Sequence, residues 1–147
     1  MITWTCKPFD ELSPHELYAI LRLRNEVFVV EQNCVFQDAD NKDQASHHLM
    51  GRQQEKLVAY TRLVPPGTAY TEPGIGRVVT DITARGSGIG RLLVQQSIAE
   101  CRKLFGNRTI RIGAQLYLEK FYRSLGFVPT GGMYPEDGIP HIQMLLS

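Results

Sequence analysis

The sequence is poor in cysteine, in long apolar runs and in excess charge of either sign. Its three cysteines, Cys6, Cys34 and Cys101, are widely separated and form no Cys-x-x-Cys pair, which argues against a disulfide framework and a thiolate metal site. The longest aliphatic or aromatic run covers residues 27–30 and is far too short to cross a bilayer. The formal net charge of +1 indicates neither nucleic acid nor a membrane surface as a partner. We therefore expect a cytoplasmic protein that binds no metal.

The length of 147 residues is about that of one domain, and 43% of the residues are hydrophobic, enough for one core. We expect residues 1–147 to form a single domain. Ser13-Pro14-His15-Glu16 supplies an N-cap, a proline at the first helical position and a capping-box glutamate, so a helix should begin there. Apolar residues then recur at helical spacing to about Val30. The polar segment 32–46 is predicted to be a loop that carries a short helical turn.

The remaining pattern predicts the element order β-α-β-β-β-α-β-α-β-β. Strands are expected at residues 2–6, 47–51, 57–64, 75–80, 109–112, 127–133 and 141–146, and two further helices are expected from the glycine-rich segment to Phe105 and at 118–125. The strand–helix–strand passage in the middle implies a parallel pair, whereas the hairpins are antiparallel. We predict a mixed α+β fold with a central, mostly antiparallel twisted sheet of six or seven strands flanked by helices.

A glycine-rich segment, Arg85-Gly86-Ser87-Gly88-Ile89-Gly90, lies between a predicted strand and a predicted helix. Glycines at such a position place several backbone N–H groups at a helix N-terminus, where they can bind a phosphate. A nucleoside-triphosphate loop is excluded, because it needs a lysine and none lies between Lys56 and Lys103. A dinucleotide fingerprint is excluded as well, since its third glycine would stand at Arg91. Simple chain reversal is the alternative use of these glycines.

The pattern Arg-x-x-Gly-x-Gly at 85–90 resembles the cofactor motif of the GCN5-related N-acetyltransferase (GNAT) superfamily. A second match is Leu118 to Phe127, which is similar to the segment of that family in which a helix carries Phe-Tyr, ends at Gly-Phe and follows a splayed strand. Three further segments extend the resemblance nearly end to end and place it in the ElaA-type branch: residues 27–34, 113–115 and 136–142. The resemblance implies an acyltransferase that uses acetyl-CoA and acetylates a primary amine of a small molecule or peptide.

The resemblance also implies roles for individual residues. Backbone groups of Val78, Val79 and Thr80 would pair with the pantetheine arm. The pyrophosphate would be bound by Arg85, Gly86, Ser87, Gly88, Ile89, Gly90 and Arg91, with Phe121 also at the cofactor. Tyr122 would point at the sulfur and act as a general acid, because a phenol stays protonated at neutral pH. The alternatives are a core position for Tyr122 and solvated surface positions for the arginines.

The proton acceptor is less clear from the sequence. Glu31, Asp38, Glu136 and His141 are candidates, but no carboxylate–histidine pair is apparent from their spacing, and a water molecule could serve instead. We assign Glu31, Asp38 and His141 to the substrate side, with a structural histidine as the alternative for His141. The acidic residues between 38 and 43 could attract a cationic amine or simply form a solvated loop.

Two other functions fit parts of the pattern. Arg24-Asn25-Glu26-Val27-Phe28 also looks like the Arg-x-x-Val-Phe signature of acyl-homoserine-lactone synthases, although those enzymes have a tryptophan where Cys34 stands. A non-catalytic module that binds acetyl-CoA is the second alternative. The sequence leaves both monomer and homodimer open, because an exposed strand edge could pair with a second copy.

Overall fold

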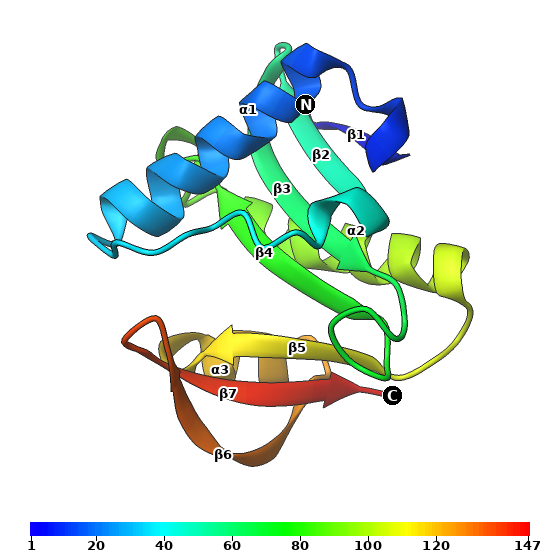
Figure 1. Cartoon of the computed structure of the whole chain (residues 1–147), viewed down its shortest axis with the longest axis vertical. Coiled ribbons are helices and arrows are strands. Elements are labelled where there is room, and N and C mark those ends of the chain that lie inside the picture. The colour runs from blue at the N-terminus through cyan, green and yellow to red at the C-terminus, as the bar shows by residue number, and fades with distance from the viewer.

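The computed structural model describes all 147 residues and contains one seven-stranded sheet with the order β1-β2-β3-β4-β5-β7-β6 (Figure 1). The strands are β1 (Thr3–Pro8), β2 (His47–Gln53), β3 (Lys56–Val64), β4 (Gly74–Thr80), β5 (Ile110–Gln115), β6 (Val128–Glu136) and β7 (Ile139–Leu146). The α-helices are α1 (Pro14–Arg24), α2 (Ile89–Phe105) and α3 (Glu119–Arg123). Only β4 and β5 are parallel neighbours. The predicted fold class and element order are confirmed.

Helix α1 covers one face of the sheet and begins as predicted. Ser13 Oγ accepts a hydrogen bond from the Glu16 backbone N–H at 3.0 Å, and the Glu16 carboxylate accepts one from the Ser13 N–H at 2.8 Å. Beyond Arg24 the chain continues as a π-helical segment, Asn25–Glu31. Buried apolar residues of this face form one cluster: Ile20, Leu23, Val27, Met50, Tyr60 and Val79. Their burial fixes α1 and the π-helical segment against β2, β3 and β4.

Helices α2 and α3 lie on the opposite face, behind the sheet in Figure 1. Strand residues alternate between the two faces, so Leu49 and Ala59 pack towards α2 while their neighbours Met50 and Tyr60 pack towards α1. The largest cluster joins α2 and α3 to β5 and β7 and includes Val94, Cys101, Ile112, Tyr122, Phe127 and Met144. The sheet is therefore buried on both faces next to the diverging strands.

Several boundaries differ from those predicted, and the clearest cases are the β2–β3 turn, the end of β5 and helix α3. The turn between β2 and β3 is only Gln54-Glu55, both with positive φ, so the strands extend further than expected. Strand β5 continues to Gln115 because its pairing with β7 runs that far. Helix α3 is shorter than predicted and ends in a Schellman motif, in which Gly126 has φ +100° and the Phe127 N–H donates to the Tyr122 carbonyl at 3.1 Å.

Candidate active site

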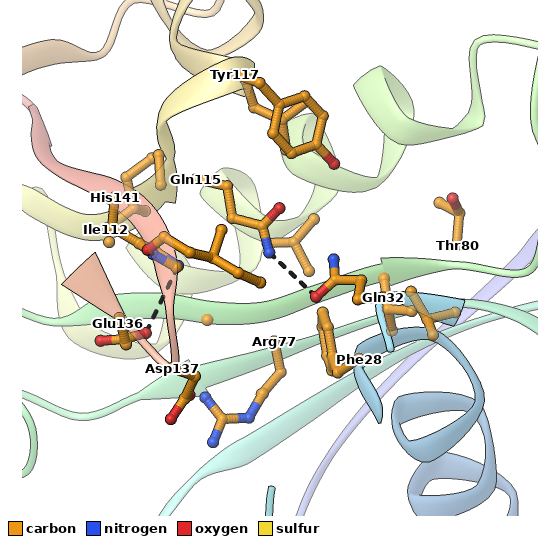
Figure 2. Close-up of a pocket in the computed structure, with 18 of the residues that line it drawn as sticks. Phe28, Gln32, Arg77, Thr80, Ile112, Gln115, Tyr117, Glu136, Asp137 and His141 are labelled. Carbon is orange, nitrogen blue, oxygen red and sulfur yellow. Dashed lines mark hydrogen bonds and ion pairs between the residues drawn. The ribbon is translucent and has the colours of Figure 1, made fainter. Parts of the chain in front are cut away.

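A cavity of about 420 Å³ opens where β4 and β5 diverge (Figure 2). The two strands pair at a single position, Gly74 with Arg111, so the rest of the β4 edge that faces β5 bonds to no strand. The other walls come from the π-helical segment, the 3₁₀ turn Leu116–Leu118, α3 and the hairpin of β6 and β7. The splayed parallel pair expected from the family resemblance is confirmed. An open strand edge inside a cavity offers main-chain N–H and C=O groups to an extended ligand.

A β-bulge bends β4 at the cavity. Arg77 and Val78 together stand opposite the single residue Thr61 of β3. Arg77 has φ +50°, an uncommon conformation for a residue with a side chain. Its guanidinium is held by Asp38, with Nε 2.7 Å from the Asp38 carboxylate and Nη2 donating to the Asp38 carbonyl at 2.8 Å. The bulge increases the bend and turns the β4 backbone away from regular pairing.

The three β4 residues assigned to the pantetheine arm, Val78, Val79 and Thr80, all line the cavity. Val79 also packs into the core beneath α1 and is 3% exposed, whereas Val78 and Thr80 are half-buried. The side chain of Val79 is thus committed to the core, and only its backbone is available to a ligand.

The glycine-rich loop presents a run of unpaired backbone N–H groups. No turn, loop or cap hydrogen bond of the backbone has its donor among residues 86–91, and no side chain caps α2. Gly86 and Gly88 have φ +87° and +79°, which glycine adopts without strain. The loop is exposed, while Ile89 is buried and anchors the first turn of α2 in the core. Unpaired donors at the N-terminus of a 17-residue helix can bind an anion.

The two arginines of this loop already have partners in the protein. Arg85 makes a two-pronged ion pair with Glu31, at 2.7 and 2.9 Å, and also donates to the Thr80 carbonyl at 3.0 Å. Arg91 donates to the Ser124 hydroxyl at 2.8 Å and to its carbonyl at 3.2 Å, which ties α2 to the end of α3. Arg85 and Gly90 line the cavity, whereas Arg91 lies outside it on the exposed surface.

Tyr122 lies in the wall of the cavity and is 5% exposed. Its ring packs edge-on against Phe121 and Phe127, with centroids 5.2 and 5.8 Å away. Burial, and to a smaller extent Tyr117, raises the pKa of the Tyr122 phenol well above its ordinary value, and no hydrogen bond contributes to this shift. Tyr122 is therefore both a core residue and a protonated hydroxyl that borders the cavity, so the two sequence-based alternatives are compatible.

A cluster of six charges lies beside the π-helical segment and reaches the cavity through Asp38 and Arg77. It consists of Arg24, Arg62, Arg77, Asp38, Asp40 and Asp43, and we call it the six-charge cluster. Its nitrogen–oxygen contacts range from 2.7 to 3.3 Å. Arg24 is completely buried and Arg62 is 4% exposed.

The arginines keep the Asp40 and Asp43 carboxylates ionised. Burial alone would raise the pKa of Asp43, but the hydrogen bonds and charges of Arg24 and Arg62 lower it below its ordinary value. The pKa of Asp40 is lowered more strongly. Burial would raise this pKa too, but Arg62 and Arg77 outweigh that effect. The prediction of a solvated acidic loop at 38–43 is therefore wrong. The sequence could not indicate these pairs, because Arg62 lies 22 residues from Asp40 and 19 from Asp43.

The expected substrate residues Glu31, Asp38 and His141 all line the cavity, but two of them are already neutralised. Glu31 is paired with Arg85, whose hydrogen bond lowers the Glu31 pKa and makes it a weaker base. Asp38 is held between Arg24 and Arg77. His141 is 7% exposed and lies near Glu136, as Figure 2 shows.

The pairing of Glu136 with His141 was not predicted from the sequence. His141 Nε2 is 3.7 Å from a Glu136 carboxylate oxygen, and both side chains line the cavity. A signal was present in Asp137-Gly138, a dipeptide typical of two-residue hairpin turns. Both residues adopt positive φ, +52° and +78°, so Glu136 faces Ile139, and Tyr134 faces His141. Residues two apart on a strand share a face, which brings Glu136 and His141 together.

No group of three or more histidine, cysteine, aspartate or glutamate side chains is arranged to hold a metal ion. None of the helices combines the length and apolar character needed to cross a membrane.

A family model described as the acetyltransferase (GNAT) domain matches residues 13–147. The chain belongs to the GNAT family. It is similar to the protein ElaA of Escherichia coli K12, with 40% identity over 146 residues that cover 98% of this chain and 95% of ElaA. These matches confirm the expected superfamily, the likeness to ElaA and the expectation of an acyltransferase.

Solved structures support the same assignment. A crystal structure of an acyl-CoA N-acyltransferase from Pseudomonas aeruginosa superposes with a TM-score of 0.96 and 40% identity over all of both chains. The crystal structure of E. coli ElaA gives a TM-score of 0.94 at 39% identity, again over all of both chains. The acyl-homoserine-lactone synthase LasI has a TM-score of 0.79 but only 12% identity, over 99% of this chain and 89% of LasI, which shows a shared fold alone.

Proposed function

We propose that this protein transfers the acetyl group of acetyl-CoA to a primary amine of a small molecule or peptide. The observation that carries the proposal is the run of unpaired backbone N–H groups at residues 86–91, next to a cavity bordered by the open edge of β4 and by Tyr122. A diphosphate is an anion whose oxygens suit such a run, and an extended amide-containing arm suits a strand edge. Both chemical groups occur in coenzyme A.

Each part of the cavity then has a role. The amides of residues 86–91 would bind the diphosphate, and backbone groups of Val78, Val79 and Thr80 would bind the pantetheine arm. A β4 amide near the bulge would donate to the thioester oxygen as negative charge develops on it. Phe121 would contact the arm from α3. Holding donor and acceptor in one cavity provides the proximity that direct transfer needs, without a covalent enzyme intermediate.

Tyr122 would donate its proton to the departing thiolate. Its raised pKa keeps the hydroxyl protonated at neutral pH. Burial affects thiols in the same direction: it raises the pKa of Cys6 and of Cys101 to about 11. A leaving thiolate in an equally buried position would become more basic as well, so proton donation from the phenol would stay accessible.

Arg85 and Arg91 would bind the donor only by sharing or exchanging their present partners. Arg85 would have to turn from Glu31, and Arg91 from Ser124. The unpaired amides therefore carry the larger share of anion binding in this proposal, and the arginines add charge at the rim of the site.

The proposal is tested by thiol release from acetyl-CoA across a library of primary amines, together with calorimetric titration of coenzyme A. We expect binding of coenzyme A and amine-dependent thiol release. Binding without thiol release with any amine would identify a non-catalytic module. Acylation that requires S-adenosylmethionine and an acyl carrier protein would instead identify a synthase of acyl-homoserine lactones. Absence of both binding and thiol release would contradict the proposal.

A further inference from the structure

The tautomer of His141 is set by its backbone neighbour. His141 Nδ1 lies 2.7 Å from the Ile139 carbonyl oxygen, on the same strand. A carbonyl oxygen can only accept a hydrogen bond, so Nδ1 must carry the proton. In the neutral ring the lone pair is then on Nε2. His141 is thus fixed in the tautomer that can accept a proton at Nε2.

The surroundings of Nε2 suit a proton acceptor. The Glu136 carboxylate, 3.7 Å away, would stabilise the positive ring formed when Nε2 takes up a proton. The ring is held by burial and by the Tyr134 ring, whose centroid is 5.8 Å away, while the Tyr134 hydroxyl is engaged by Gln143 at 2.7 Å. On the neighbouring strand β5, the residue paired with His141 is the uncharged Gln115, whose side-chain amide donates to Gln32 at 3.4 Å. The charged groups nearest in the hairpin are the carboxylates of Glu136 and Asp137.

The cavity as a whole favours a cation. Four carboxylates line it, those of Glu31, Asp38, Glu136 and Asp137, against two guanidinium groups, those of Arg77 and Arg85. Both arginines are paired with Asp38 or Glu31, so neither is a free positive charge. Glu136 and Asp137 have no arginine or lysine partner. The excess negative charge therefore lies on the hairpin, beside His141.

We infer that the acceptor is a small cationic amine, that His141 Nε2 takes its proton, and that Glu136 is the positioning residue for that step. This inference rests on the proposed function and adds the acceptor class and the base. An alkyl ammonium has a pKa of about 10 and must lose a proton before it can attack. That proton passes to Nε2, and the amine nitrogen then bonds to the acetyl carbon as the carbon–sulfur bond breaks. Tyr122 protonates the departing thiolate, and the second proton, lost from the new amide nitrogen, restores the Tyr122 hydroxyl, so His141 carries the one net proton released.

The test uses the full chain, acetyl-CoA and 1,4-diaminobutane, with a panel of further alkyl diamines, followed by thiol release. His141→Ala should lower kcat/KM by roughly 100-fold, the scale of a lost general base. Free imidazole should restore part of the rate, which a merely structural histidine would not allow. Glu136→Gln should lower kcat/KM about 10-fold and shift the ascending limb of the pH profile between pH 5 and 8, where imidazole side chains titrate.

Two matched controls accompany these variants. His15→Ala removes an exposed histidine of α1, and Glu55→Gln removes a carboxylate from the other two-residue hairpin turn, between β2 and β3. Both should leave kcat/KM unchanged. Thermal unfolding of each variant shows whether it folds, and Glu136 is exposed enough for Glu136→Gln to fold even if His141→Ala does not.

The outcomes separate this inference from the proposed function. The role of His141 is overturned if His141→Ala turns over the diamine as fast as the wild type. It is also overturned if turnover falls but imidazole does not restore it and Glu136→Gln has an unchanged pH profile. Binding of coenzyme A without acetylation of any cationic amine overturns the acceptor class. Absence of coenzyme A binding refutes the proposed function itself and the inference with it.

Discussion

Two regions border the same cavity and differ in whether their polar groups have partners within the protein. In the six-charge cluster, buried and half-buried carboxylates and guanidinium groups contact one another at 2.7 to 3.3 Å. In the glycine-rich loop, the backbone N–H groups of residues 86–91 have no backbone partner in the protein. Paired charges hold a shape, whereas unpaired donors at a helix N-terminus are available to a ligand. We therefore expect a structural role for the six-charge cluster and a binding role for the glycine-rich loop.

The largest effect should come from breaking the six-charge cluster. Arg24→Met removes the completely buried arginine that Asp38 and Asp43 share, and we expect the free energy of unfolding to fall by about 3–5 kcal/mol. Urea denaturation measures this loss. Arg22→Met is the matched control, since Arg22 forms only an exposed pair with Glu26 at 3.7 Å and should cost less than about 1 kcal/mol. Equal losses for the two variants would contradict a structural role for the cluster.

Low pH should also weaken the six-charge cluster and so lower the stability of the protein. The pKa values of Asp40 and Asp43 are lowered in the folded state, so their stabilising effect is present above the ordinary aspartate pKa of about 3.9 and is lost as pH falls below it. Stability measured by urea denaturation should therefore decline from about pH 4 downwards. Asp40→Asn should make this decline shallower. A decline just as steep in Asp40→Asn would show that other carboxyl groups are responsible.

Tyr122→Phe tests whether the Tyr122 hydroxyl acts in catalysis. The ring and its packing remain and only the hydroxyl is lost, so we expect kcat to fall by roughly 100-fold while the Kd for coenzyme A stays the same. Steady-state thiol release and calorimetry measure the two quantities. Tyr18→Phe, on the exposed surface of α1, is the control. Unchanged turnover in Tyr122→Phe would remove the proposed role of the phenol.

Gly88→Ala tests the loop itself. Gly88 has φ +79°, and a side chain there costs about 1–2 kcal/mol, although open space surrounds the position. The change should distort the amides and raise the Kd for coenzyme A about 10-fold, as measured by calorimetry. Gly106→Ala is the matched control at the other end of α2, with φ +87° and similarly open space. It should lower stability but not binding, and equal losses of binding would indicate a general effect on α2.

The smallest effect is expected at the rim of the site. Arg91→Ala removes an exposed side chain that now bonds to Ser124, so the Kd for coenzyme A should rise by only about threefold, typical of an exposed charge. Calorimetry at low and high salt should show the difference shrinking as salt rises. A loss greater than that of Gly88→Ala would mean that the arginine, and not the amides, dominates anion binding.

The sequence predicted what depends on local pattern. Ser13 and Glu16 predicted the start of α1, the glycine spacing predicted the loop before α2, and Gly126 predicted the end of α3. The sequence did not predict contacts between residues that are far apart along the chain. The charges of Asp40 and Asp43 are balanced by an arginine on β3, and no local pattern encodes such a pair.

The hairpin is an intermediate case. Asp137-Gly138 is a typical two-residue turn, but the predicted strands at 127–133 and 141–146 left it out, and its consequence for Glu136 and His141 required the strand register.

The central claim is that the main-chain N–H groups at 86–91 bind the diphosphate of coenzyme A. The most direct measurement is a titration of the isotope-labelled protein with coenzyme A, followed by amide resonances in two-dimensional NMR. We predict that the resonances of residues 86–91 shift most and that those of the Gln54-Glu55 turn stay unchanged. If coenzyme A binds while the resonances of 86–91 do not move, the claim is contradicted.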